Sequence, residues 1–162
     1  MSTLQANSRN CFVCGLNNPA GLHLRFYTTA PGQVEAHYTV SKHFEGYPGV
    51  VHGGIIAAML DEATGRSHMG GEQPRFMFTA KLDIRYRQNV PVGQPLRLVG
   101  IAGKSRGRTA TAEAFLYNAK GELLAEAEAL LVDVPRDKIP VEDVDSMGWR
   151  VYSDAEIEGQ KE

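Results

Sequence analysis

The residue types best suited to chemistry lie together within residues 44–68, in the stretch FEGYPGVVHGGIIAAMLDEATGRSH. A loop rich in aromatic residues, proline and glycine leads into His52-Gly53-Gly54, and Asp61 follows nine residues after the histidine. The N–H groups in the first turn of a helix are unpaired and lie at the positive end of its dipole, so they can hold a developing negative charge. A carboxylate can act as a general base or as a nucleophile. The stretch therefore holds the parts of a site for attack on a carbonyl group.

One helix must position these groups, and the sequence predicts that it begins at the glycines and ends near Gly70-Gly71. Apolar residues recur at helical spacing, and alanines fill the positions between them, which predicts a helix that is buried rather than amphipathic. The apolar positions are Ile55, Ile56, Ala57, Ala58, Met59, Leu60 and Ala63. Burying a carboxylate in such a helix costs free energy unless it has a partner, so an acidic residue there indicates an ion pair or a function. Asp61 is therefore the most informative residue of the chain.

Two adjacent carboxylates, Asp61 and Glu62, compete for the active role. Adjacent helical residues point about 100° apart, so only one of them can face a given site. Glu62 has Arg66 four residues ahead, which is the favourable orientation for an ion pair on a helix surface. Asp61 has Gly65 at that distance, which leaves open space beside its carboxylate. We therefore predict Asp61 as the active acid; the alternative is a carboxylate tied structurally to a neighbouring chain.

Composition favours one soluble, cytoplasmic domain. A chain of 162 residues buries roughly two-thirds of its unfolded surface. No stretch approaches the ~18 apolar residues of a membrane helix, and residues 1–10 lack an apolar signal core. The net charge is −2; residues 136–162 hold eight acidic and four basic side chains, a balance of −4, so residues 1–135 carry +2. We expect neither nucleic-acid nor membrane binding.

The two cysteines, Cys11 and Cys14, form a single CxxC pair. One pair cannot close a four-ligand zinc site within a chain, and no second pair of cysteines or histidines has the required spacing. The following Gly15–Pro19 segment is typical of a turn rather than of the helix that usually follows a redox pair. We expect structural thiols, with shared metal binding and redox chemistry as the alternatives.

Alternating patterns predict six strands around the helix, in the order β-β-α-β-β-β-β. They cover residues 22–27, 34–40, 76–87, 96–101, 109–117 and 123–132, with an Asn118–Gly121 hairpin turn. Small alanines line one face of the last two strands and leave room for the helix. This predicts an α+β fold in which an antiparallel sheet wraps one helix.

We divide the chain into a flexible lead (1–10), this domain (11–135) and a loosely packed acidic tail (136–162), in which Trp149, Val151 and Tyr152 are the expected anchors.

The motif VHGGIIAAMLDEA resembles the signature of hotdog-fold acyl-CoA thioesterases of the phenylacetate-pathway (PaaI-like) superfamily. The segment Thr79–Tyr86 is similar to the strand after the helix in the human mitochondrial branch, and Cys11–Leu22 resembles the N-terminal segment of a bacterial subgroup. The likeness covers residues 11–133. It implies a hotdog fold, a homodimer or homotetramer with sites across the dimer interface, and an acyl-CoA substrate.

Within this resemblance we assign roles to single residues. Gly54 N–H is the expected oxyanion donor, and Gly53 allows close approach of the substrate. His52 either positions the carbonyl or water or fixes the loop through a backbone hydrogen bond. Thr79 matches the position that supplies a hydroxyl near the attacking water; an ordinary strand threonine is the alternative. Glu62 is a further candidate substrate contact.

Three cations, Lys104, Arg106 and Arg108, are predicted to lie in one turn between strands, where they can pair with the phosphates of coenzyme A. A solvated turn is the alternative interpretation of such a run.

Geometry predicts that the site needs two chains. Gly54 and Asp61 are seven residues apart, about 10 Å along one helix, so they cannot both reach one carbonyl group. We predict an acyl-CoA thioesterase that needs no metal or organic cofactor. The alternatives are an acyl-CoA binding module without turnover and a hotdog-fold enoyl-CoA hydratase.

Overall fold

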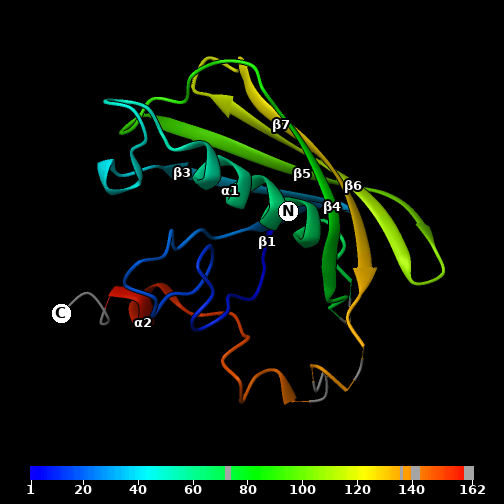
Figure 1. Ribbon diagram of the computed structural model, residues 1–162. Coiled ribbons are helices and arrows are strands. Elements are labelled where there is room, and N and C mark those ends of the chain that lie inside the picture. Colours follow the sequence, from blue (N-terminus) through cyan, green and yellow to red (C-terminus); the bar gives the residue numbers. More distant parts are fainter. Residues whose placement is uncertain (72–73, 136, 140–142, 159–162) are drawn as a thin grey trace.

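The computed structural model describes residues 1–71, 74–135, 137–139 and 143–158. Its elements are β1 (Thr3–Leu4), β2 (Tyr27–Ala30), β3 (Gln33–Thr39), the 3-10 helix η1 (Lys42–Phe44), α1 (Gly53–Arg66), β4 (Met77–Tyr86), β5 (Pro95–Arg106), β6 (Thr109–Asn118), β7 (Leu123–Asp133) and α2 (Asp154–Glu158). The strands form one antiparallel sheet in the order β1-β2-β3-β5-β6-β7-β4, which curves around α1 (Figure 1). The predicted α+β arrangement is confirmed. None of the helices among the described residues is long and apolar enough to cross a bilayer.

Small residues bring α1 close to the sheet. Ala114, Ala125 and Ala127 are at most 2% exposed and belong to the same core cluster as the buried residues of α1. The closest approach is at Gly100 in β5, where an added Cβ would lie 2.2 Å from the carbonyl oxygen of Ala63 in α1. These three alanines of the predicted stripe thus face the helix, and Gly100 extends the contact to a third strand, whereas Ala112 and Ala129 pack in a separate cluster.

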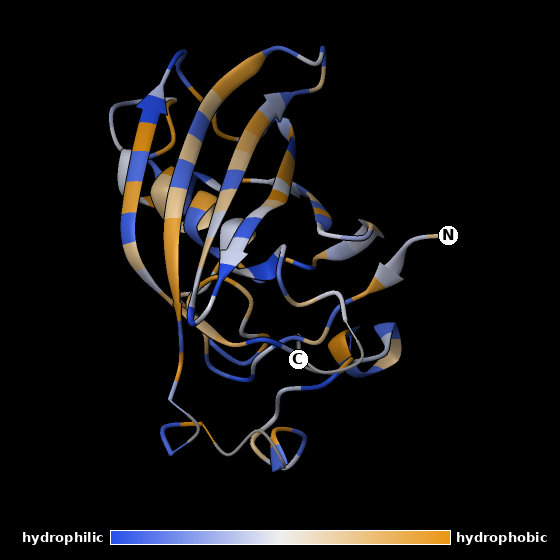
Figure 2. Cartoon of the chain, turned by 90° about the vertical axis from the view of Figure 1, so that its right-hand side faces the viewer, coloured by the Kyte–Doolittle hydropathy of each residue, from blue (hydrophilic) through white to orange (hydrophobic). Residues whose placement is uncertain are grey.

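The helix buries one face rather than all of its sides. Ile56, Met59, Leu60 and Ala63 are buried, whereas Ala57 and its neighbour Ala58 are only half-buried and Gly54 is exposed. The prediction of burial on every side is therefore wrong for a single chain. The long strands show the matching alternation of apolar and polar residues, visible as orange and blue bands in Figure 2.

A β-bulge at Ala80 changes the phase of β4. Thr79 pairs with Leu131 and Lys81 pairs with Leu130, so Ala80 has no partner in the register. Because two residues oppose one across the bulge, residues before and after it exchange faces of the sheet. Phe78 is 57% exposed as a result. Strict alternation along residues 76–87 puts Phe78 and Ala80 on the core face, and this expectation is wrong because both are exposed.

Part of the predicted flexible lead, residues 1–10, is held against the body of the protein. β1 pairs with β2, and the Asn7 side chain donates to the carbonyls of Cys14 and Leu24 at 2.8 and 2.9 Å. Residues 22–26, predicted as a strand, are irregular because the His23 backbone adopts a left-handed φ of 59°. Their apolar side chains are nevertheless buried, and Leu24 N–H donates to the carbonyl of Val13.

The C-terminal segment also packs on the body of the protein, on the same side of α1 as the N-terminal segment (Figure 1). Arg150 pairs with Asn7 in an antiparallel bridge. Trp149 contacts Phe76 edge to face, with ring centroids 5.2 Å apart, and Tyr152 is 6% exposed. Of the three predicted anchors, Trp149 and Tyr152 thus pack on the body, whereas Val151 is 52% exposed. Residues 136, 140–142 and 159–162 lie outside the described residues.

The contact between Gly100 and α1 yields a stability prediction. A Gly100→Ala substitution forces a methyl group against the helix backbone, and overpacking of this kind lowers the free energy of unfolding by about 1–3 kcal/mol. Gly65→Ala in α1 is the matched control, because nothing lies within 4 Å of its added Cβ. Alanine favours a helix over glycine by about 1 kcal/mol, so the control should be stabilised. Urea denaturation measures both; a Gly100→Ala protein as stable as the wild type would contradict the close approach.

Candidate active site

His52 forms the junction between the glycine-rich loop and α1. Its Nδ1 accepts a hydrogen bond from Gly54 N–H at 2.9 Å, which makes it the N-cap of the helix. Its own N–H donates to the carbonyl of Phe44 at 2.9 Å. Its carbonyl accepts from Ile55 N–H and Ile56 N–H at 3.0 and 3.2 Å. The His52 side chain therefore satisfies a helix N–H that would otherwise be unpaired.

This cap changes which amide can receive a ligand. Gly54 N–H, the predicted oxyanion donor, is already engaged by His52. Gly53 N–H has no hydrogen-bond partner in the part of the chain that the structure describes. The carbonyl of Gly53 accepts from the Tyr86 hydroxyl at 2.9 Å, which fastens the start of α1 to the end of β4. The amide of Gly53 is thus the more available of the two.

Asp61 contacts the strand that follows the helix. Its Oδ1 accepts a hydrogen bond from the Thr79 hydroxyl at 2.6 Å, and its main-chain carbonyl accepts from the Thr64 hydroxyl at 2.7 Å. Nothing lies within 4 Å of a Cβ added at Gly65, one turn further along the helix. The carboxylate is partly exposed, and among the described residues Oδ2 has no hydrogen-bond partner. Asp61 and Thr79, predicted separately, lie together.

A single chain does not bring Asp61 to the glycine amides. Both belong to α1, and their separation of seven or eight residues corresponds to about 10–12 Å along a helix. Within one chain, Asp61 and the glycine amides thus lie too far apart to act on the same carbonyl group, as the prediction of a two-chain site assumed.

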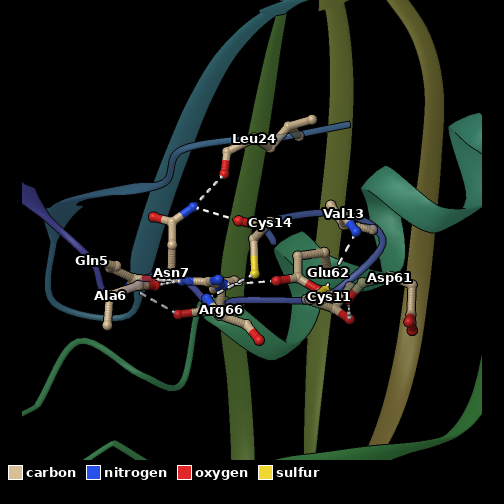
Figure 3. A network of polar contacts seen from close by, with 12 residues as sticks. Gln5, Ala6, Asn7, Cys11, Val13, Cys14, Leu24, Asp61, Glu62 and Arg66 are labelled. Carbon is tan, nitrogen blue, oxygen red and sulfur yellow. Dashed lines mark hydrogen bonds and ion pairs between the residues drawn. The ribbon is translucent and has the colours of Figure 1, made fainter. Parts of the chain in front are cut away.

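Glu62 faces a different environment from Asp61. Its Oε1 accepts from Arg66 Nε at 2.9 Å, and its Oε2 lies 3.9 Å from Cys11 Sγ (Figure 3). The predicted ion pair exists, but it is not a surface pair, because the Arg66 side chain is 1% exposed. The Arg66 guanidinium lies between the rings of Phe26 and Trp149, 5.1 and 4.7 Å from their centroids. Packing of both terminal segments against the helix buries this pair.

Cys11 and Cys14 lie beside Glu62 as free thiols. A hydrogen bond from Cys14 lowers the pKa of Cys11 to about 6. The same hydrogen bond, together with burial, raises the pKa of Cys14. No sequence signal joins this pair to Glu62, which lies about fifty residues further along the chain.

The three predicted phosphate-binding cations are exposed at the hairpin between β5 and β6. Lys104 and Arg106 belong to β5 rather than to a turn, and only Gly107 and Arg108 lie between the strands. Figure 1 places this hairpin beyond the C-terminal end of α1, away from the glycines at its start. Within one chain the structure therefore does not bring the cations to the glycine amides.

Arg75 is a fourth cation at this hairpin that the sequence analysis missed. It donates to Ser105 Oγ at 3.0 Å and to Asp133 Oδ1 at 2.7 Å. Its position before β4 gave no signal of either contact, because both partners are distant in the sequence.

Comparison with known proteins identifies relatives of this chain. Residues 48–125, which include the capped helix and Asp61, match the thioesterase superfamily. The acyl-coenzyme A thioesterase THEM4 of Xenopus laevis is 29% identical over 111 residues, which are 66% of this chain and 48% of that protein. The chain therefore spans about half the length of the curated relatives it matches.

Solved structures share the fold. The thioesterase superfamily protein RHA08564 is 30% identical, with a TM-score of 0.71 over 77% of this chain and 61% of that one. The PaaI protein of the Escherichia coli phenylacetic acid degradation operon is 14% identical, with a TM-score of 0.64 over 70% and 81%. The protein smu.793 of Streptococcus mutans, solved with acetyl CoA, is 19% identical, with a TM-score of 0.63 over 68% and 88%. Residues 48–125 therefore belong to the thioesterase superfamily, within a hotdog fold that is distantly related to acyl-coenzyme A thioesterases.

Proposed function

We propose that this protein hydrolyses an acyl- or aryl-CoA thioester to the free acid and coenzyme A. The observation that carries the proposal is the Asp61 carboxylate, which accepts from the Thr79 hydroxyl at 2.6 Å beside the open space at Gly65. Acetyl CoA bound to a protein of the same fold supports the substrate class. The distant kinship with acyl-coenzyme A thioesterases supports the reaction.

Asp61 acts as general base or nucleophile. As a base it takes a proton from water, whose oxygen attacks the thioester carbonyl carbon; the C–S bond then breaks and the departing thiolate takes up the proton. In direct attack the carboxylate bonds to the carbonyl carbon, the C–S bond breaks and coenzyme A leaves as the thiolate; water then hydrolyses the resulting mixed anhydride, which releases the free acid and restores the carboxylate, and the released proton passes to the thiolate. The Thr79 hydroxyl holds one carboxylate oxygen and leaves the other for the water or the substrate.

The start of α1 supplies the oxyanion site. Two amides are candidates, and they differ in the present structure: Gly54 N–H donates to His52 Nδ1, while Gly53 N–H is unpaired among the described residues. Gly53 N–H can therefore donate to an oxyanion without any rearrangement of the site. Gly54 N–H, the donor predicted from the sequence, joins it only if the His52 ring turns away.

The complete site is formed by two chains. Asp61 and the glycine amides are about 10 Å apart on one helix, so a partner supplies the second half. β4 is the natural contact, since it ends the sheet and exposes Phe78 and Tyr86. A long exposed edge strand pairs readily with another strand. In such a dimer or tetramer Lys104, Arg106 and Arg108 can serve a site that includes the partner's residues, with Gly53 as a further contact. Glu62, the other contact expected from the sequence, is paired with Arg66 instead.

Replacing Asp61 tests the activity directly. In Asp61→Asn, thiol release from acyl-CoA should fall by about 10²–10⁴ in kcat, because the base or nucleophile is lost while the side-chain shape is kept. Short, medium, long and aryl acyl-CoAs should be assayed in parallel to reveal the acyl preference. Asp137→Asn, an exposed change outside the site, is the control. A folded wild type that binds these esters without releasing thiol would favour a binding module, and hydration of enoyl-CoA instead would favour a hydratase.

The two amides can be separated by proline substitution. Gly53→Pro removes an N–H at the first helical position, where proline is well tolerated, and should lower kcat with little loss of stability. Gly53→Ala keeps the N–H, and its Cβ makes only an ordinary 3.6 Å contact with Tyr86, so its kcat should stay near that of the wild type. Gly54→Pro removes the bond to His52 and should destabilise the protein. Loss of kcat in a stable Gly54→Pro, with Gly53→Pro still active, would assign the oxyanion to Gly54.

Mixing two inactive proteins tests the two-chain site. Gly53→Pro and Asp61→Ala subunits should each be inactive alone, but heterodimers should regain about half of their sites, since one of the two sites at the interface combines an intact amide with an intact carboxylate. Thiol release is measured on heterodimers isolated with two different tags. Absence of recovery in verified heterodimers would place the whole site in one chain.

A further inference from the structure

A second group of reactive side chains lies outside the site for hydrolysis. Cys11, Cys14 and Glu62 place one sulfur or oxygen atom each within 4.8 Å of the other two. Two of these residues come from one loop and the third from α1 (Figure 3). Thiolates and carboxylates are both zinc ligands, and two intervening residues are a common spacing in zinc sites.

We propose that Cys11, Cys14 and Glu62 bind a structural zinc ion, with a water molecule as the fourth ligand. Zinc lies about 2.3 Å from sulfur and about 2.0–2.2 Å from oxygen, so tetrahedral ligand atoms are about 3.5–3.8 Å apart. Cys11 Sγ and Glu62 Oε2 are already 3.9 Å apart. Since no pair exceeds 4.8 Å, the three atoms need to close by only about 1 Å.

The loop holds both sulfurs with backbone donors. Val13 N–H points at Cys11 Sγ at 3.3 Å, and Ser8 N–H points at Cys14 Sγ at 3.5 Å. Such donors stabilise thiolates, the form that binds metal. The turn itself requires Gly15, because a Cβ there would lie 2.3 Å from the backbone nitrogen and oxygen of Cys11.

The surrounding charges balance a divalent cation. Two thiolates and the Glu62 carboxylate carry three negative charges, and zinc supplies two positive ones. Arg66 supplies the remaining positive charge through its 2.9 Å ion pair with Glu62. Among the described residues Glu62 is the only acidic side chain that Arg66 pairs with; its Nη1 donates to the neutral carbonyl of Ala6. A cluster of buried ionised groups is stable only when its charges are paired.

The ion would act on structure rather than on the thioester. Asp61 points away from Cys11 and Glu62 in Figure 3, as expected for a neighbouring helix position. Zinc would join the loop of Cys11 and Cys14 to the middle of α1, and the partial exposure of Cys11 leaves a route for the ion. This inference is independent of the proposed hydrolysis, for which we expect no metal.

The test is metal content of the full chain, purified without chelator and equilibrated with zinc. Wild type and the matched carboxylate control Glu113→Gln, an exposed residue of β6, should hold stoichiometric zinc by elemental mass spectrometry. Cys11→Ser and Cys14→Ser should lose it, and Glu62→Gln should bind it at least tenfold more weakly, on the order of the 10–100-fold effects seen when zinc sites are perturbed.

Two further readouts keep the test decisive if a cysteine variant fails to fold. Cobalt added to the wild type should give near-ultraviolet thiolate-to-metal absorption, which Glu62→Gln should alter. A chelator should lower the melting temperature of the wild type and leave that of Glu62→Gln nearly unchanged. Wild type without zinc, a Cys11–Cys14 disulfide in its place, or zinc retained in folded Cys11→Ser would overturn the proposal.

Discussion

The backbone of α1 lies directly against the sheet, and the other features of the molecule depend on that contact. Where Gly100 faces Ala63, no side chain separates strand from helix. A helix held this close to a curved sheet has little freedom to rotate or slide, because packed interiors have no space to spare. Its first turn therefore meets the end of β4 through Gly53 and Tyr86. Its middle presents Asp61 to the start of the same strand.

The sequence predicted the elements whose pattern is local. Alternation located β3 and the long strands β5 to β7, and helical spacing located α1, since burial on one face imposes a period on the chain. Prediction from the sequence failed where contacts with residues distant in the chain determine the backbone conformation. Residues 22–26 alternate like a strand but turn at His23 and bond to the cysteine loop. Both terminal segments lack periodicity, yet they pair with each other through Asn7 and Arg150.

For the candidate site, too, features set by local spacing could be predicted from the sequence, and features set by distant contacts could not. The start of the helix at the glycines and the choice of Asp61 over Glu62 rested on spacing along one helix, and the structure gives the two carboxylates separate environments. Thr79 could be named from a resemblance, but its phase depended on a bulge at Ala80. A bulge of one residue has no reliable sequence signature. The burial of Arg66 was equally hidden, because segments from both ends of the chain create it.

The pairing of Asn7 with Arg150 has a consequence for how the molecule assembles. Bringing together positions so distant along a chain costs loop-closure entropy that local hairpins do not pay. The meander of β5, β6 and β7 can form early with α1, while the layer of terminal segments docks last. Backbone amides in that layer should exchange with solvent hydrogen through local opening well before those of the central strands. Because Ala6 and Trp149 of that layer contact Arg66, its opening would expose the ion pair of Arg66 and Glu62 to water.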